Sequence, residues 1–426
     1  MSTTMTPTAG VPAGATATTA LAPRNWRMPI LLGAGALLSL LVFVLLSPAV
    51  ESTGVHYLGD SQPDLVLPTR VTNLLLTIVM LALAGVVAWL VAKRRTPSIW
   101  FVAVFGLLWV TALILWVGVG ATVPLTWFLT STFSLATPLV FGSMAGLVSE
   151  RSGVVNIAIE GQLLAGAFTG ALVSSITQNA YIGLIAAMLA GALVSLILAV
   201  FGIKYWVEQV VVGVVINMIV IGLTNYFYSG FMSDNRAVFN SPVKYDRWNI
   251  PLLADIPVLG PLFFQHTLIT YLMFLLVPLL TFALYRTRWG LRTRSVGEHP
   301  KAADTVGIKV NRTRFMNVLL SGLIAGAGGT FFTLGQVGAF TQEVTSGQGY
   351  IALAALIFGR WHPLYATAAA LLFGFANSIA ALAGQVGAPV PSEVMLMVPY
   401  IVTVLAVIGF VGQSRAPAAD GVPYIK

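Results

Sequence analysis

Residues 286–314 read RTRWGLRTRSVGEHPKAADTVGIKVNRTR, and this basic stretch decides how the rest of the chain is arranged. It holds eight of the 22 Lys and Arg residues of the chain, against only Glu298 and Asp304 on the acidic side. Apolar runs long enough to cross a membrane flank it on both sides. Because cytoplasmic loops between membrane spans carry an excess of Lys and Arg, we predict that this loop faces the cytoplasm.

The middle of the loop has the start and stop signals of a short helix. Pro300 suits the first helical position, where a backbone N–H would have no helical partner, and Gly307 suits the position just past the helix end. The sequence therefore predicts a two-turn helix over 300–306, a rigid element suited to docking against another protein. An ordinary loop that only fixes the membrane orientation is the alternative, and charge alone favours that alternative.

The composition identifies an all-α polytopic membrane protein. Hydrophobic residues make up 57% of the chain and charged residues 8%, whereas about 25% of an average soluble protein is charged. The basic residues lie beside apolar runs, so membrane orientation explains the net charge of +8 better than nucleic-acid binding does. The absence of cysteine and the scattered positions of the four histidines exclude disulfides and give no metal-ligand spacing, so we expect no metal site.

Hydropathy predicts about 11–12 membrane segments, with broken or short helices among them. The predicted full spans are 28–46, 71–92, 99–121, 127–148, 157–176, 182–203, 210–228, 268–285, 315–334, 364–383 and 394–411. The run 350–359 has about half of the roughly 20 residues that a span needs, which favours a half-helix. Between the spans, residues 229–265 are too polar to cross and too aromatic for a plain linker, so we predict an ordered external cap.

Successive spans cross the membrane in opposite directions, and placing the N-terminus in the cytoplasm gives an orientation that agrees with the charges of the loops. Eighteen of the 22 Lys and Arg residues then fall inside and four outside, the outer ones being Arg70, Arg236, Lys244 and Arg247. Lys and Arg follow this bias in membrane proteins, whereas acidic residues contribute little to it. We therefore predict a multi-pass protein of the cell membrane with both termini in the cytoplasm.

Two polar interruptions, 149–162 and 341–349, lead directly into membrane segments. The first contains Asn156, Glu160 and Gly161, which we treat as a broken-helix motif. The predicted topology places the first interruption on the cytoplasmic side and the second outside, as in inverted repeats of a broken-helix unit. Turn formation and close helix packing explain Gly153, Gly161, Gly347 and Gly349 equally well. For Glu160, near a span end, capping or snorkelling is the simpler interpretation.

Four uncharged amides lie within or at the ends of the spans, namely Asn217, Asn225, Gln336 and Asn377. Polar groups are costly in hydrocarbon and face a cavity or another helix. Asn217 and Asn225 share one helix face. Amides can hydrogen-bond the hydroxyls and bases of a neutral solute, so the set predicts a substrate path. For any single amide, hydrogen bonding between helices is the simpler alternative.

Three motifs resemble the branched-chain-type permease family of ABC importers, and most closely its nucleoside and simple-sugar subgroup. They are Thr137-Pro138-Leu139 with residues 150–161, the run VGEHPKAADTVGI at 296–308, and IFGRWHP at 357–363. The resemblance covers about residues 127–412 and implies a type II ABC importer-like permease core. It divides the chain into a disordered cytoplasmic tail (1–23), a three-helix extension (24–121), the core (122–413) with its coupling loop (286–314), and a cytoplasmic C-terminal tail (414–426).

The resemblance also implies partners and a role for the basic loop. A separate ABC ATPase subunit would bind ATP and Mg, a second permease subunit of the same or a homologous kind would complete the path, and an extracellular lipoprotein would bind the substrate. The phosphate-binding signature GxxxxGK[ST] is absent from this chain. The resemblance assigns coupling to the ATPase to Gly297, Glu298, His299, Pro300, Lys301, Ala302, Ala303, Asp304 and Gly307.

These features predict a transport subunit without catalytic residues or a cofactor of its own, importing nucleosides at the expense of ATP. A permease for ribose or another simple sugar is the alternative within the class, since amides and aromatic residues serve both solutes. A secondary transporter would have similar hydrophobicity, but no Asp, His or Lys relay lies in the middle of a predicted span. A membrane enzyme would need a polar catalytic cluster, and none is visible.

Overall fold

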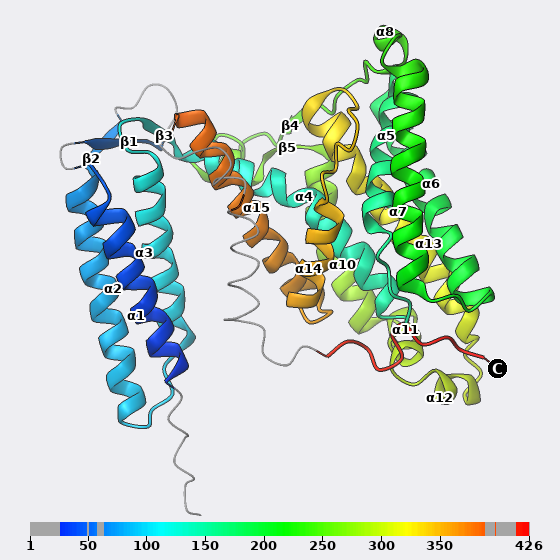
Figure 1. Ribbon diagram of the computed structural model, residues 1–426, viewed down its shortest axis with the longest axis horizontal. Coiled ribbons are helices and arrows are strands. Elements are labelled where there is room, and N and C mark those ends of the chain that lie inside the picture. Colours follow the sequence, from blue (N-terminus) through cyan, green and yellow to red (C-terminus); the bar gives the residue numbers. More distant parts are fainter. Residues whose placement is uncertain (1–25, 49–50, 58–63, 388–396, 398–414, 426) are drawn as a thin grey trace, which may run out of the picture. The chain divides into compact units, whose positions relative to one another are not determined.

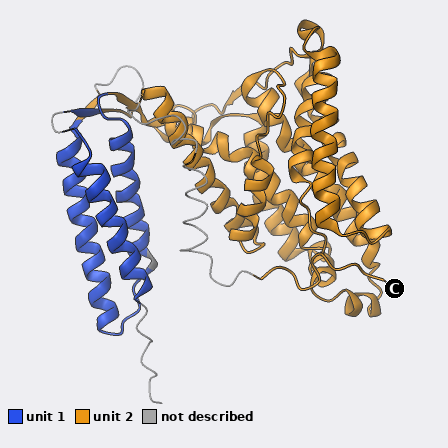
Figure 2. Cartoon of the chain, in the orientation of Figure 1, with its two compact units in different colours: residues 1–53, 67–120 blue, residues 54–66, 121–426 orange. Residues whose placement is uncertain are grey.

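The computed structural model describes residues 26–48, 51–57, 64–387, 397 and 415–425 (Figure 1). The predicted tail 1–23 and most of the last predicted span, 394–411, lie outside the described residues. The chain forms two compact units, residues 1–53 with 67–120 and residues 54–66 with 121–426 (Figure 2).

The first unit contains three long helices. They are α1 (Arg27–Ser39), continued by a π-helical stretch η1 (Leu40–Leu45), α2 (Thr69–Ala92) and α3 (Ile99–Val117). Ala36 and Met80 are fully buried between them, and the Ser39 and Thr77 hydroxyls share a hydrogen bond of 2.9 Å. The opposite faces expose large apolar side chains such as Leu75 and Trp100, as expected of helices whose surroundings are lipid.

The second unit carries the remaining helices. They are α4 (Leu125–Glu150), α5 (Ile159–Thr177), α6 (Ala180–Ala199) with η2 (Val200–Lys204), α7 (Gln209–Phe227) with η3 (Tyr228–Met232), α8 (Arg236–Phe239), α9 (Leu259–Phe263), α10 (Leu268–Arg286), α11 (Arg288–Glu298), α12 (Pro300–Thr305), α13 (Val310–Thr330) with η4 (Phe331–Val337), α14 (Gln348–Phe358) and α15 (Pro363–Val386).

Short strands lie beside these helices. They are β1 (Ser52–His56), β2 (Leu65–Pro68), β3 (Thr122–Pro124), β4 (Arg247–Asn249) and β5 (Gln265–Thr267). Gly54 pairs with Thr122 in a parallel β1–β3 contact, and Trp248 pairs with His266 in the antiparallel β4–β5 contact. The segment 229–265 is ordered as predicted, because Asn240 exchanges two hydrogen bonds with the backbone of Phe340, at 2.9 and 2.7 Å.

Ten helices among the described residues are long and apolar enough to cross a membrane, and each overlaps one of the predicted spans. The eleven-residue helix α14 is too short, in agreement with the predicted half-helix. The all-α polytopic fold is therefore confirmed.

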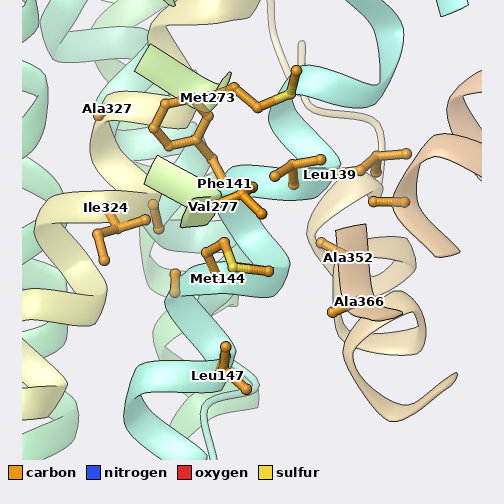
Figure 3. Close-up of a cluster of buried hydrophobic side chains, with 14 of the residues drawn as sticks. Leu139, Phe141, Met144, Leu147, Met273, Val277, Ile324, Ala327, Ala352 and Ala366 are labelled. Atoms are coloured by element: carbon orange, nitrogen blue, oxygen red, sulfur yellow. The ribbon is translucent and has the colours of Figure 1, made fainter. Parts of the chain in front are cut away.

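Helices α4, α5 and α13 form the centre of the second unit. Buried residues make up 72%, 78% and 78% of their most apolar windows, against 33% for α6, α7 and α10. In the core shown in Figure 3, Phe141 and Met144 of α4 lie between Ile324 of α13 and Val277 of α10. The most central helices are thus the ones that carry the interrupted motifs at their ends.

Glycines allow α13 to approach its neighbours closely. A Cβ atom on Gly166 of α5 would lie 2.3 Å from the Gly326 carbonyl oxygen, and one on Gly191 of α6 would lie 2.2 Å from that of Gly322. Backbones in contact at this distance leave no room for a side chain. These glycines therefore form the surfaces on which α5, α6 and α13 pack.

Candidate functional site: the coupling loop and the interrupted helices

Helix α12 forms where the turn signals predict it. It spans Pro300–Thr305 with Pro300 in its first turn, and Gly307 follows with φ of +84°, a conformation that favours glycine. The helix ends one residue before the predicted limit. Sequence reasoning missed the preceding helix α11, although its buried residues Gly290, Thr293, Val296 and Gly297 recur at helical spacing.

One face of α12 is anchored and the other is open. Ala303 is 2% exposed and packs with Val296 and Val310 in a small apolar cluster. Lys301 is exposed, and Val306, just after the helix, is 75% exposed. Helix α12 therefore packs on the chain with one face and leaves the other accessible.

The predicted coupling residues touch the chain just after α4. A Cβ atom on Gly297 would lie 2.3 Å from the Arg151 carbonyl oxygen, and a Glu298 carboxylate oxygen lies 3.9 Å from an Arg151 guanidinium nitrogen. His299 and Ala302 are exposed, and Asp304 is half-buried. The loop is therefore packed directly on the connection between α4 and α5.

The third motif reaches the same point from α14 and α15. The Trp361 indole N–H donates to the Glu150 carboxylate at 2.5 Å, and the Arg151 Nε donates to the Trp361 carbonyl oxygen at 2.8 Å. Segments that lie more than 200 positions apart thus meet at Glu150 and Arg151. The signal for this site in the sequence was a charged pair, Glu150 and Arg151, at the end of an otherwise apolar span. The residues that bond to this pair could not be predicted from that signal.

The Glu160 carboxylate joins the two polar interruptions. Glu160 is 4% exposed; one oxygen accepts from the Thr345 hydroxyl at 2.6 Å and the Gly347 N–H at 2.9 Å, and the other accepts from the Gly349 N–H at 2.6 Å. It lies in the first turn of α5 and at the start of α14, where the helix dipoles stabilise a negative charge.

The two polar interruptions meet at Glu160 inside the bundle. That they lie on opposite sides of the membrane stays a prediction. After η4 the chain turns back, with Phe340 and Thr345 fully buried, so that the short α14 begins beside the start of α5. Glu160 does act as a cap, and the helix that its carboxylate caps is α14. A half-helix exposes orphan N–H groups inside an apolar bundle, and a buried carboxylate satisfies them.

Asn156 lies in a buried network of amides and hydroxyls. Its side chain pairs reciprocally with the Gln162 amide, each N–O distance being 3.1 Å. Asn156 also donates to the Ser321 hydroxyl at 2.8 Å, and Gln162 donates to the Ser195 hydroxyl at 2.9 Å. The α4–α5 connection is thereby fastened to α5, α6 and α13.

Asn217 of α7 fastens the start of α5 from the other side. Its amide oxygen accepts from the Gly161 N–H at 2.8 Å, and its amide nitrogen donates to the Ile157 carbonyl at 2.9 Å and the Tyr350 hydroxyl at 3.1 Å. Gly161 has no space for a side chain, since an added Cβ would lie 2.9 Å from the Asn217 oxygen. These bonds match the alternative of hydrogen bonding between helices.

The other three amides are separate from this cluster. Asn225 is half-buried, and its side-chain oxygen has no hydrogen-bond partner among the described residues. Gln336 is exposed, and its backbone carbonyl accepts from the Lys244 ammonium at 3.3 Å. Asn377 is half-buried on α15. In the described part of the chain, no hydrogen bond joins these amides to one another or to Asn217.

An apolar helical bundle with a short helix packed against the ends of α4 and α13 has the architecture of a multi-pass membrane protein. The chain belongs to the family described as branched-chain amino acid transport system / permease component, whose model matches residues 128–407. The match falls within the second unit and includes all three motifs. A role in transport, and not in catalysis, is thereby supported.

Curated relatives agree with this assignment. The chain is 44% identical to the guanosine ABC transporter permease protein NupQ of Bacillus subtilis over 70% of this chain and 95% of the relative. It is 38% identical to the nucleoside ABC transporter permease protein NupC of Lactococcus lactis over 68% and 94%. It is 33% identical to a putative glucose ABC transporter permease protein, TsgC13, of Haloferax volcanii over 59% and 76%. No solved structure matches the chain.

Proposed function

We propose that this permease subunit imports nucleosides and is driven by an ATPase that docks on α12. The observation that carries the coupling role is the seating of α12, whose buried face rests on the apolar cluster while Lys301 and Val306 are free for a partner. A short helix fixed at one face transmits a displacement to the bundle, whereas a flexible loop would absorb it.

The contacts describe a route for that displacement. Movement of α12 reaches Gly297 and Glu298, which contact Arg151 at the end of α4. From there the α4–α5 connection leads to Glu160, whose carboxylate holds the start of α14. The Gly297–Gly307 residues named for coupling therefore act on the helices that meet at the centre of the bundle.

The partners follow from the same proposal. ATP and Mg bind to a separate ABC ATPase subunit on the cytoplasmic side, where the basic loop and both termini lie. A second permease subunit and an extracellular lipoprotein that binds the substrate complete the transporter. The proposal is supported by relatives that are themselves named ABC transporter permease proteins and by the Lys and Arg excess of the loop.

Nucleosides are the proposed substrate class because the two relatives with the higher identity are named for guanosine and nucleoside transport. A simple sugar is the second candidate, favoured by the relative named for glucose. Asn217, Asn225, Gln336 and Asn377 remain the proposed path. Of these, Asn225 and Asn377 are half-buried and better placed to meet a solute, because the Asn217 amide is engaged by three hydrogen bonds.

Uptake in cells that contain the whole transporter tests this function. Labelled guanosine and ribose are supplied with ATP held constant and the proton gradient collapsed. We expect guanosine uptake to continue, and to stop when the partner ATPase is inactivated. Uptake that follows the proton gradient and ignores the ATPase would establish a secondary transporter instead, and preference for ribose would establish the sugar alternative.

A further inference from the structure

Residues 415–425 lie across the base of the coupling loop, close to α11 (Figure 1). The Ala419 N–H donates to the Gly297 carbonyl at 2.9 Å, and the Ala418 N–H donates to the Glu298 carboxylate at 3.3 Å. Pro417 and Ala419 are buried. This segment, which we call the strap (residues 417–424), is therefore bonded to the same two residues that contact Arg151.

Arg314 holds the other side of the strap. It lies in the first turns of α13 and is 1% exposed, the largest of the fully buried side chains among the described residues. Its guanidinium donates to the carbonyl oxygens of Val422 at 2.7 Å, Ala419 at 3.3 Å and Ser152 at 3.1 Å. A buried cation is costly unless its donors are satisfied, and here backbone carbonyls satisfy them.

The backbone opposite Arg314 is shaped to admit this guanidinium. Gly153 has φ of +88°, and a Cβ atom there would lie 2.7 Å from an Arg314 nitrogen and 3.0 Å from the Ala419 carbonyl oxygen. Both the conformation and the space require glycine at this position. The α4–α5 connection, the strap and α13 thus meet in one close contact.

Tyr424 brings the strap to α12 itself. Its ring packs against the cluster of Val296, Ala303 and Val310, which anchors the buried face of α12. Ile308 packs against the same cluster, and Tyr424 adds its aromatic ring. The strap therefore contacts α11, α12, α13 and the α4–α5 connection.

We infer that the strap is part of the element that transmits ATPase motion, with Arg314 as its positioning residue. This inference rests on the proposed coupling function. The strap joins the Gly297 carbonyl of α11 to Arg314 of α13, and Arg314 itself donates to the Ser152 carbonyl, so these three segments form one bonded unit. Two sites are coupled only through elements that shift as a unit.

The test uses the full transporter reconstituted with its ATPase and binding protein. One variant ends after residue 414, a second carries Tyr424→Ala, and Ile425→Ala serves as the control, since Ile425 is 62% exposed and belongs to no cluster. We expect uptake per ATP hydrolysed to fall about tenfold in the first two, within the range typical of coupling between sites, and to be unchanged in the control. Assembly with the ATPase, measured by co-purification, should be retained.

Each other outcome overturns a definite part of the inference. A proline within α12, Ala303→Pro, tests the coupling function itself. If both strap variants transport normally and Ala303→Pro abolishes uptake, the strap has no part in transmission and the proposed function stands. Normal uptake in Ala303→Pro removes the coupling function itself. Loss of ATPase co-purification in Tyr424→Ala would make the strap a docking surface for the ATPase instead. If the shortened chain fails to insert, Tyr424→Ala decides alone.

Discussion

The Glu160 carboxylate accepts the Gly349 N–H at 2.6 Å, so the first turn of α5 directly caps the first turn of α14. The same carboxylate accepts from Thr345 and Gly347. The half-helix α14 is therefore held by a carboxylate from the first turn of α5.

Replacing Glu160 by Gln should destabilise the bundle. An amide offers one acceptor oxygen, so at least one of the three donors loses its partner, and hydrogen bonds to charged groups contribute about 1.5–3 kcal/mol each. Melting curves of the purified protein in detergent measure the loss. The matched control is Glu343→Gln, which changes an exposed carboxylate. Equal melting temperatures for the two variants would show that Glu160 does not stabilise α14.

A proline in α12 should uncouple transport without preventing insertion. The Ala303 N–H donates to the His299 carbonyl at 3.0 Å, and Ala303→Pro removes this bond and clashes with the preceding turn, at a cost of about 3 kcal/mol or more. ATP-dependent uptake at normal expression is the measurement, and we expect its loss. Ala303→Ser is the control, because serine keeps the backbone N–H and its hydrogen bond to the His299 carbonyl. Normal uptake in Ala303→Pro would contradict the coupling role.

Asn217 and Asn377 should respond differently to leucine. Asn217→Leu leaves the Gly161 N–H and the Ile157 carbonyl without their partner, so we expect lower thermal stability, by roughly 0.6 kcal/mol per lost bond in a membrane. Asn377→Leu should instead alter the ranking of nucleosides and pentoses, since discrimination depends on buried polar groups of the path. Competition uptake assays beside melting curves separate the two effects. An unchanged ranking in Asn377→Leu removes this residue from the path.

Docking of the strap should weaken as pH rises. The pKa of Asp420 is raised to about 8, first by burial and then by the nearby Glu150 carboxylate, while Arg314 opposes the shift. The docked carboxyl thus keeps a proton that the released segment loses above its ordinary pKa of 3.8, so docking is favoured at low pH and this advantage is lost as pH rises towards 8. Hydrogen-exchange protection of residues 417–424, compared at about pH 6 and about pH 8.5, checks this.

Asp420→Asn provides the control for that measurement. An amide does not titrate, so protection of the strap should be nearly equal at the two pH values and, at the higher pH, greater than in the unchanged chain. A pH dependence that persists in Asp420→Asn would assign the effect to another group.

The amino-acid sequence by itself determined which segments form helices long and apolar enough to cross a membrane, and where helix α12 lies. Ten of the predicted spans correspond to helices, and α12 begins at Pro300 and stops before Gly307, because hydropathy and turn chemistry act over a few neighbouring residues. The half-helix α14 was predictable for the same reason, since a run of ten apolar residues is too short to span.

Only the tertiary structure decided which polar groups meet. Glu160 and Gly349 are 189 positions apart, Trp361 and Glu150 are 211 apart, and Arg314 and Ser152 are 162 apart. Apolar helices of similar length offer many nearly equivalent pairings, and no periodicity within one helix indicates its neighbour. Backbone contact at glycines such as Gly166 and Gly322 selects one arrangement, and that arrangement brings the buried carboxylate, amides and guanidinium to their partners.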